Sequence, residues 1–196
     1  MEFIETLETL KMKYGNNNLV RNNGTILLGP EKIPKCRHML FRPLSEKMIN
    51  AYLVAEYANE FPKEYIEFLK YSNGANLYSV RLKTEKFSIA HPMMVIFGLP
   101  LTPPFGRPLD MEEPYDLRVE DLARHADIPT SWLKCGTYIR EYNFKLTYDI
   151  FIDTKTKRIF STEKNKNTVI ESWENLDECF SCIYTRLLDS KSEYKY

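Results

Sequence analysis

The apolar pattern of the chain changes its period twice, and this change limits the folds that the chain can adopt. Helical spacing comes first, strand-like stretches follow from Ala75, and helical spacing returns near the C-terminus. The last pattern is an apolar stripe at intervals of three and four, formed by Trp173, Leu176, Phe180, Ile183 and Leu187. Because such spacing puts side chains on one face of a helix, that face must be buried. The order predicts an α+β fold with a mostly antiparallel sheet, packed by N-terminal helices and one C-terminal helix.

Three helices are expected ahead of the strands. The first spans Glu2 to Lys13, and the second spans Ser45 to Asn59, with its opening serine as the N-cap. The third begins at Pro62, because a proline lacks the N–H that would have no partner at the first helical position. It ends at Asn73 and Gly74, two residue types that tolerate a positive φ where the chain leaves a helix.

Strands are expected in the middle of the chain, where apolar residues alternate with polar ones or form short runs between turn residues. They comprise Thr25–Leu28, then LYSVRL, FSIAH and MMVIFG, a strand that opens at Pro129 and turns near Gly136, and a hairpin of YDIFID and RIFST around TKTK. In the hairpin, Ile150 and Ile152 should share one face and Phe151 the other. The segment Lys32–Pro43 has no clear period and is expected to be irregular, and Ser172 is placed to cap the last helix.

Length and composition are those of one folded domain. The 196 residues suffice for a single core, and 27 basic residues balance 27 acidic ones. The balance removes a long-range attraction to nucleic acid or to an anionic membrane. The apolar stretch Ala90–Leu101 is too short to cross a bilayer, and the acidic N-terminus is unlike a secretory signal. Because four cysteines are ordinary for reduced thiols, we expect a cytoplasmic protein.

The cysteines and histidines do not predict a metal or redox site. Cys179 and Cys182 have Cys-x-x-Cys spacing, but they flank the apolar stripe, and no second pair with metal-ligand spacing exists. We therefore interpret the thiols as structural. The remaining members of these residue types are isolated in the sequence: Cys36, Cys135, His38, His91 and His125. No metal and no cofactor is expected.

Other candidates for catalysis also have a structural interpretation. Ser72 follows a helix instead of a strand, which is unlike a nucleophile elbow, and the seven glycines never form a phosphate loop. The pairs Glu64/Glu67 and Asp149/Asp153 have spacings that are equally typical of solvated surface acids. The sequence therefore predicts a protein that is not an enzyme.

One acidic segment has a functional interpretation. The stretch DMEEPYDLRVED holds six acids and one base in twelve residues, a net charge of minus five. Such a patch raises the association rate of a basic partner, with Tyr115 as an aromatic anchor, whereas the alternative is a solubilising loop. The predicted partner-binding residues are Asp110, Glu112, Glu113, Tyr115, Asp116, Glu120 and Asp121. A milder basic patch, interpreted as a solvated hairpin and linker, comprises Lys155, Lys157, Arg158, Lys164 and Lys166.

Several short motifs follow one another in a characteristic order. The first half carries Phe61-Pro62, Tyr65, Phe68-Leu69 and Asn73-Gly74 within PLSEKMINAYLVAEYANEFPKEYIEFLKYSNGA. The second half carries IPTSWLKCGTY, YDIFIDTKTKRIF and VIESWENLDECFSCIYTRLL. This order resembles the SUKH superfamily, in particular its group of fungal cell-wall-synthesis regulators. The resemblance covers residues 44–188, so residues 1–43 are expected to be an N-terminal extension of a single domain. Phe61 replaces the usual leucine, and the acidic, proline-rich stretch is longer than in the family.

The resemblance implies a function as well as a fold. Bacterial proteins of this kind are commonly cytoplasmic immunity proteins, each of which binds the C-terminal toxin domain of a polymorphic toxin, often a nuclease, and covers its active site. Nuclease surfaces are basic, so the acidic segment would imitate nucleic acid. The chain itself would bind neither nucleic acid nor membrane. The alternative is a regulatory scaffold like the fungal relatives, which binds several proteins and inhibits none.

Overall fold

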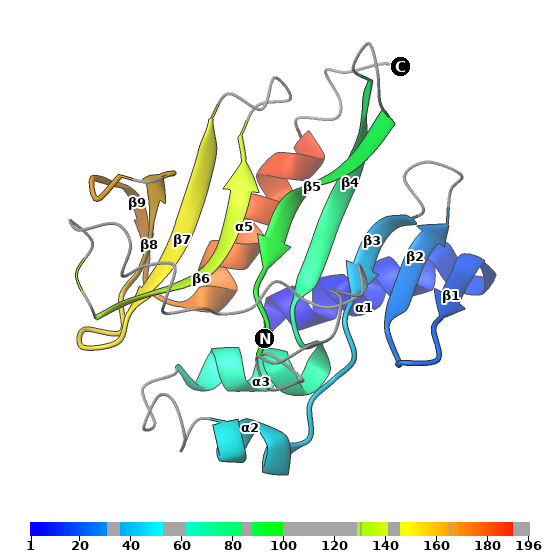
Figure 1. The fold of residues 1–196 in the computed structure, drawn as a ribbon, viewed down its shortest axis with the longest axis horizontal. Helices are drawn as coiled ribbons and strands as arrows, with labels where there is room; N and C mark the ends of the chain where they lie inside the picture. Colours follow the sequence, from blue (N-terminus) through cyan, green and yellow to red (C-terminus); the bar gives the residue numbers. More distant parts are fainter. Residues whose placement is uncertain are drawn as a thin grey trace, which may run out of the picture.

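One antiparallel sheet of nine strands organises the part of the chain that the computed structural model describes, namely residues 1–30, 36–52, 62–83, 88–99, 129, 131–140, 146–164 and 166–189. Each strand pairs with its neighbours along the chain, in the order β1 to β9 (Figure 1). The strands are β1 (Asn18–Val20), β2 (Ile26–Pro30), β3 (Cys36–Leu40), β4 (Ala75–Lys83), β5 (Ser88–Ile96), β6 (Trp132–Ile139), β7 (Thr147–Asp153), β8 (Ile159–Glu163) and β9 (Val169–Trp173).

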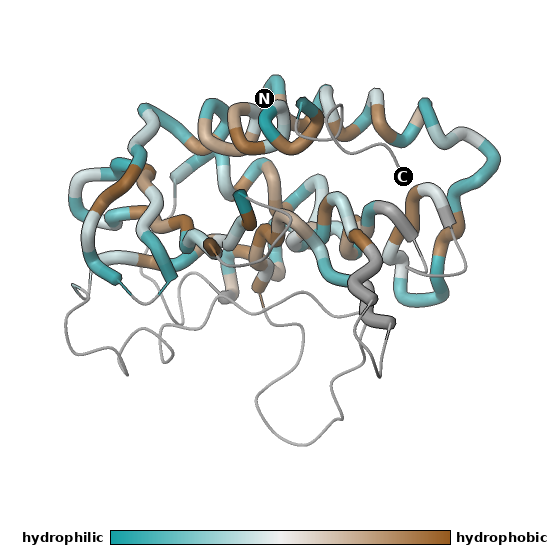
Figure 2. The backbone as a smooth tube through the Cα atoms, turned by 90° about the horizontal axis from the view of Figure 1, so that it is seen from above, coloured by the Kyte–Doolittle hydropathy of each residue, from teal (hydrophilic) through white to brown (hydrophobic). Residues whose placement is uncertain are grey.

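Four helices and a short 3₁₀ turn accompany the sheet in the described residues: α1 (Glu2–Tyr14), η1 (Gly15–Asn17), α2 (Glu46–Tyr52), α3 (Lys63–Tyr71) and α5 (Leu176–Asp189). Helices α1 and α5 cover one face of the sheet, and α2 and α3 lie at one end of it (Figures 1 and 2). The predicted α+β fold with an antiparallel sheet is therefore confirmed. Among the described helices, none is long and apolar enough to cross a membrane.

The main core lies between the sheet and the helices α1, α3 and α5. Phe3 of α1 packs against Phe180 of α5 and Phe68 of α3, with ring centroids 5.3 and 6.3 Å apart. All three rings are fully buried. Because α1 shares this core and β1 to β3 continue the same sheet, the described residues among the first 43 pack in one body with the later strands and helices. The division at residue 44 stays a prediction.

The opposite face of the sheet carries a second, smaller cluster. Phe151 and Phe160 are cross-strand partners on β7 and β8, with stacked rings 5.8 Å apart, and Trp132 packs on them. The neighbouring Ile150 and Ile152 belong to the main core, so the predicted alternation of this hairpin is confirmed. Because side chains alternate between the two faces of a strand, the hairpin contributes apolar residues to both faces of the sheet.

The starts of α2 and α3 depend on local chemistry. The Ser45 hydroxyl accepts a hydrogen bond from the Met48 N–H at 3.3 Å, as predicted for an N-cap. Pro62 stands one residue earlier than predicted, because it is the N-cap of α3 and Lys63 is its first helical residue. The predicted continuation of the second helix beyond Tyr52 lies outside the described residues.

Two expectations about the early and middle strands are wrong. Part of the segment expected to be irregular forms β3, because Leu28 and Asn76 on the flanking strands offer backbone partners to His38 and Met39. Residues 88–91 of the first stretch and 93–96 of the second belong to one strand, β5, despite Pro92 between them. This proline is tolerated because, in the described chain, β6 pairs with β5 only from Met94 onward.

Two further expectations about Gly136 and Ser172 are also wrong. Gly136 lies within β6, beside a β-bulge, and not at a turn. A Cβ there would lie 2.6 Å from the Val95 carbonyl oxygen, so the glycine permits close strand approach. Ser172 belongs to β9, and the side chain of Asn175 caps α5 by accepting the Glu178 N–H at 2.8 Å. The apolar stripe suggested an earlier start of the helix because Trp173, on β9, packs in the same core as the apolar residues of α5.

Candidate interaction site

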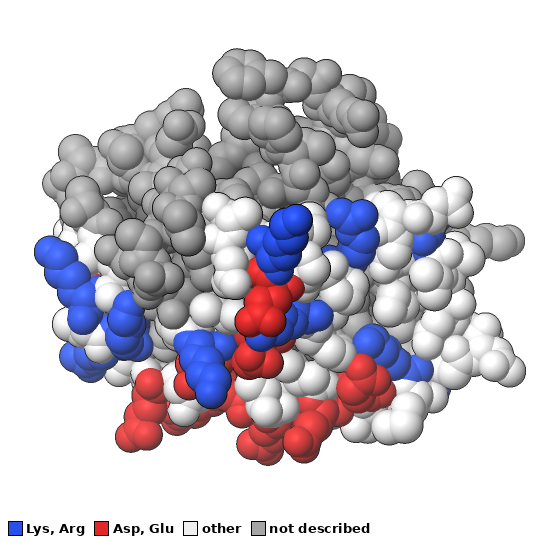
Figure 3. All heavy atoms as spheres, turned by 90° about the horizontal axis from the view of Figure 1, so that it is seen from below, with Lys and Arg blue, Asp and Glu red and all other residues white. Residues whose placement is uncertain are grey.

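The acidic segment predicted to bind a partner lies outside the described residues. This applies to all of Asp110, Glu112, Glu113, Tyr115, Asp116, Glu120 and Asp121, so their role stays a prediction. Among the described residues, Figure 3 shows basic and acidic side chains mixed on the face seen from below, with acidic ones gathered along its lower margin. The mixture agrees with the balanced charge of the whole chain.

The Ser72-Asn73-Gly74 loop has a structural role in holding α3 against the sheet. The Ser72 hydroxyl, which is fully buried, donates to backbone carbonyls and lies 2.6 Å from the Gly74 oxygen and 3.1 Å from the Phe41 oxygen. The Asn73 side chain accepts the Leu99 N–H at 2.7 Å and donates to the Leu99 carbonyl at 2.8 Å. Gly74 has φ 91°, as predicted for the exit from the helix. A buried hydroxyl bound to carbonyls in this way is not an exposed nucleophile.

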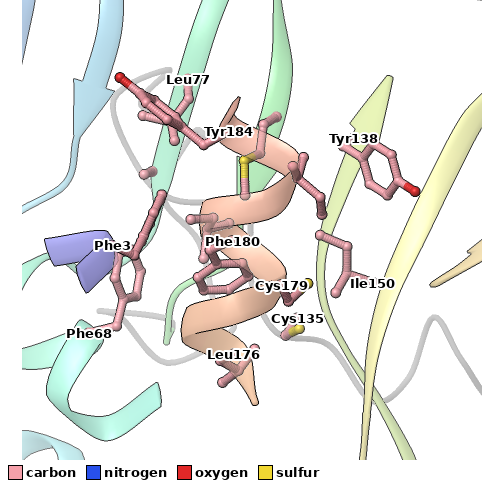
Figure 4. Packing of buried hydrophobic residues seen from close by; sticks show 14 of the residues in the cluster. Phe3, Phe68, Leu77, Cys135, Tyr138, Ile150, Leu176, Cys179, Phe180 and Tyr184 are labelled. Atoms are coloured by element: carbon pink, nitrogen blue, oxygen red, sulfur yellow. The ribbon is translucent and has the colours of Figure 1, made fainter. Parts of the chain in front are cut away.

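Two thiols, one from β6 and one from α5, lie side by side in the core, and a third lies three residues further along α5. Cys135 and Cys179 are fully buried and lie next to each other in Figure 4, while Cys182 is half-buried. Burial raises the pKa of both Cys135 and Cys179, so they remain protonated and poorly nucleophilic. In the described part of the chain, no three His, Cys, Asp or Glu side chains are placed to hold a metal ion. Cys36 lies in β3, in a position whose side chain is outside the description.

The two described histidines, His38 and His91, have different environments. His38 is fully buried, and its Nδ1 accepts the Tyr78 N–H at 3.3 Å. Tyr78 has φ 54°, an uncommon backbone for a strand residue, and its ring packs 4.6 Å from His38 and 5.2 Å from Tyr184. His91 is exposed, and His125 lies outside the described residues. No sequence pattern indicated the His38–Tyr78 contact, because it joins positions 40 residues apart.

The interpretation of the paired carboxylates as solvated surface acids is wrong for Asp149. Asp149 is buried and forms an ion pair with Lys134 at 2.8 Å across β6 and β7. Burial raises the pKa of Asp153, but hydrogen bonds from the Thr156 hydroxyl and the Lys155 N–H outweigh it and leave that pKa below its ordinary value. Glu67 forms an exposed ion pair with Lys70.

A pocket that no sequence motif indicated lies where the β7–β8 turn approaches the β9–α5 junction. Its volume is about 430 Å³. Its lining comprises Thr156, Lys157, Arg158, Ser172, Trp173, Glu174 and Glu178. The two basic residues belong to the basic patch that the sequence suggested, and the strand pairing of β8 with β9 brings them close to the start of α5. The sequence did not indicate the pocket, because its two walls lie on different elements of the chain.

Together these observations define an α+β protein in which several buried polar side chains hold backbone segments together and exposed polar side chains line one pocket. Comparison of the chain with models of protein families, with curated proteins and with solved structures gave no match. The SUKH assignment, which comes from the order of sequence motifs, therefore stays a prediction.

Proposed function

We propose that the chain is a cytoplasmic immunity protein. It binds the toxin domain of a cognate polymorphic toxin, for which a nuclease is the first candidate, and blocks its active site. The proposal combines the SUKH-like order of motifs with the properties of the described residues. The elements α2, α3, β4 to β9 and α5 follow one another in an order that agrees with the order of those motifs.

The buried Ser72-Asn73-Gly74 loop is the observation that carries the proposal. This stretch contains Asn73-Gly74, one of the motifs on which the resemblance rests. The side chains of Ser72 and Asn73 hold backbone segments together. A motif that only supports the fold is compatible with a protein that acts by binding through its surface. Such a protein requires no catalytic group. A rigid frame also lowers the ordering cost of binding a protein partner.

Co-purification is the first test. The tagged chain is expressed together with the product of the neighbouring gene, and we expect one tight partner at equal stoichiometry. If the partner is a nuclease, the digestion of DNA or RNA should fall linearly until one equivalent of the chain has been added. Several weak partners, or a bound nuclease with full activity, would favour the regulatory scaffold instead.

Charge reversal tests the acidic segment. Replacement of Glu112, Glu113 and Asp116 by lysine should slow association with the captured partner by about tenfold or more at low salt, because a charged rim governs encounter rates. Stopped-flow or surface-binding kinetics at two salt concentrations measure the effect, with Glu64, Glu67 and Asp189 replaced by lysine as the matched control. Equal association rates for the two triple variants would remove the segment from the interface.

A further inference from the structure

The pocket between the β7–β8 turn and the β9–α5 junction has walls of opposite charge. Lys157 and Arg158 on the turn contribute two positive charges, and Glu174 and Glu178 at the start of α5 contribute two negative ones. All four residues are exposed. Among the described residues, no ion pair joins Arg158 to either glutamate. The charge of Arg158 and those of the two glutamates therefore face the same space without an ion pair between them.

Hydrogen bonds donated by backbone N–H groups hold both walls in place. In the turn, the Lys157 N–H donates to the Asp153 carbonyl at 2.7 Å, and the Asp153 N–H donates to the Arg158 carbonyl at 2.9 Å. In the other wall, the Glu178 carboxylate accepts the Glu174 N–H at 2.9 Å, next to the Asn175 cap. The charged side chains therefore extend from a pre-formed backbone, and a ligand would have to order only the side chains.

The arrangement of charge selects the kind of ligand. An ion of either sign would be attracted to one wall and repelled by the other, so its net gain is small. A ligand that carries a carboxylate and a cation a few ångströms apart gains from both walls at once. Ser172 and Trp173 of β9 also line the pocket, and β9 is the last strand of the sheet. An extended polypeptide can follow such an edge through its backbone.

We propose that this pocket binds a polypeptide segment of the partner protein that carries an acidic and a basic side chain close together. The acidic side chain lies against Arg158, and the basic one lies against Glu174 and Glu178. This inference rests on the proposed function, because it names a contact that a protein partner makes. It is independent of the acidic segment predicted from the sequence.

Capped tripeptides test the inference directly. The isotope-labelled chain is titrated with acetyl-Arg-Ala-Asp-amide, and the chemical shifts of the Ser172 amide and the Trp173 indole are followed. Two matched probes, acetyl-Gln-Ala-Asp-amide and acetyl-Arg-Ala-Asn-amide, each lack one charge. We expect millimolar binding of the doubly charged peptide and about fivefold weaker binding of either control, as for exposed ion pairs.

Variants locate the effect. Arg158→Gln and Glu174→Gln remove one charge from each wall, and neither side chain makes a hydrogen bond or ion pair with other described residues, so folding should be retained. Each should lower the affinity for the doubly charged peptide by about fivefold. Lys155→Gln, on the same turn but outside the pocket lining, should leave it unchanged.

The outcomes separate this inference from the proposed function. Equal binding of the three peptides, the lack of shifts at Ser172 and Trp173, or an equal loss in Lys155→Gln would overturn the pocket assignment. If the Arg158→Gln/Glu174→Gln variant binds the captured partner as tightly as the native chain, the pocket inference fails and the proposed function stands. If the native chain captures no protein partner, the proposed function fails.

Discussion

At the scale of single residues, Asn73 shows how one side chain can join two distant segments. Its amide forms two hydrogen bonds with the backbone of Leu99, 26 positions further on, and it is fully buried. Gly98 lies so close that a Cβ there would be 2.3 Å from the Asn73 carbonyl oxygen. The contact therefore depends on the amide of one residue and on the missing side chain of another.

Asn73→Ala should lower the free energy of unfolding by about 3 kcal/mol, because it leaves a buried N–H and a buried carbonyl without partners. Urea denaturation measures this loss. Asn22→Ala, at an exposed turn position, is the matched control and should change stability by less than about 0.5 kcal/mol. Equal stability of the two variants would contradict the role given to the Asn73 amide.

The sequence predicted part of this site at residue scale. The pair Asn73-Gly74 indicated the end of a helix, and the structure places the positive φ at Gly74. Leu99 could not be predicted as the partner of Asn73, because no local rule links residues across two strands. The acid Asp149 illustrates the same limit, since its ion pair with Lys134 depends on the register of β6 and β7.

At the scale of elements, α1 and α5 are joined by a cap that crosses the chain. Both oxygens of the Asp177 carboxylate, in the first turn of α5, accept N–H groups of α1, from Glu2 and Phe3, at 2.9 Å. The start of α1 has no side-chain cap of its own. A carboxylate at this position also interacts favourably with the helix dipole.

Asp177→Ala should destabilise the protein by about 1–2 kcal/mol, since it removes two charge-assisted hydrogen bonds from the N-terminus of α1. Hydrogen exchange should show faster opening of the first turn of α1 than of α5. Asp177→Asn retains one acceptor oxygen and should recover part of the loss. As a control, Glu5→Ala removes an exposed acid from the same turn and should cost no more than a few tenths of a kcal/mol. A loss confined to α5 would argue against the cap.

Element boundaries were predictable where local chemistry sets them. The sequence indicated α1, the Ser45 cap and the β7–β8 hairpin, because each depends on residues within a few positions. The sequence did not predict β3 and β9, because these two strands form through pairing with neighbouring strands of the sheet.

At the scale of the whole molecule, buried ionisable groups make the free energy of unfolding depend on pH in the alkaline range. Burial raises the pKa of Tyr138 from its ordinary value of 10.0 to about 12, although its contact with the Ser161 hydroxyl opposes the rise. Burial likewise raises the pKa of Tyr71, Tyr184, Cys135 and Cys179. In each case the folded chain holds the proton more tightly than the unfolded chain does.

Stability should therefore be fully present below the ordinary pKa of cysteine, 9.0, and should decline as the pH rises through 10 toward 12. The reason is that the unfolded chain releases these protons first. Urea midpoints measured across this range test the decline, and Tyr138→Phe should make it less steep. A midpoint that stays constant up to the tyrosine range would show that these groups are solvated.

The sequence by itself determined the fold class, the division into helical and strand regions, and the two-faced hairpin of β7 and β8. These follow from the period of apolar side chains, which decides the buried face of each element independently of its neighbours. Only the tertiary structure decided the pairing of β3 and β9, the Asp177 cap on α1, and the pocket with two charged walls. Each of these needs two segments to meet, and the energy of such a contact belongs to the pair and not to either segment alone.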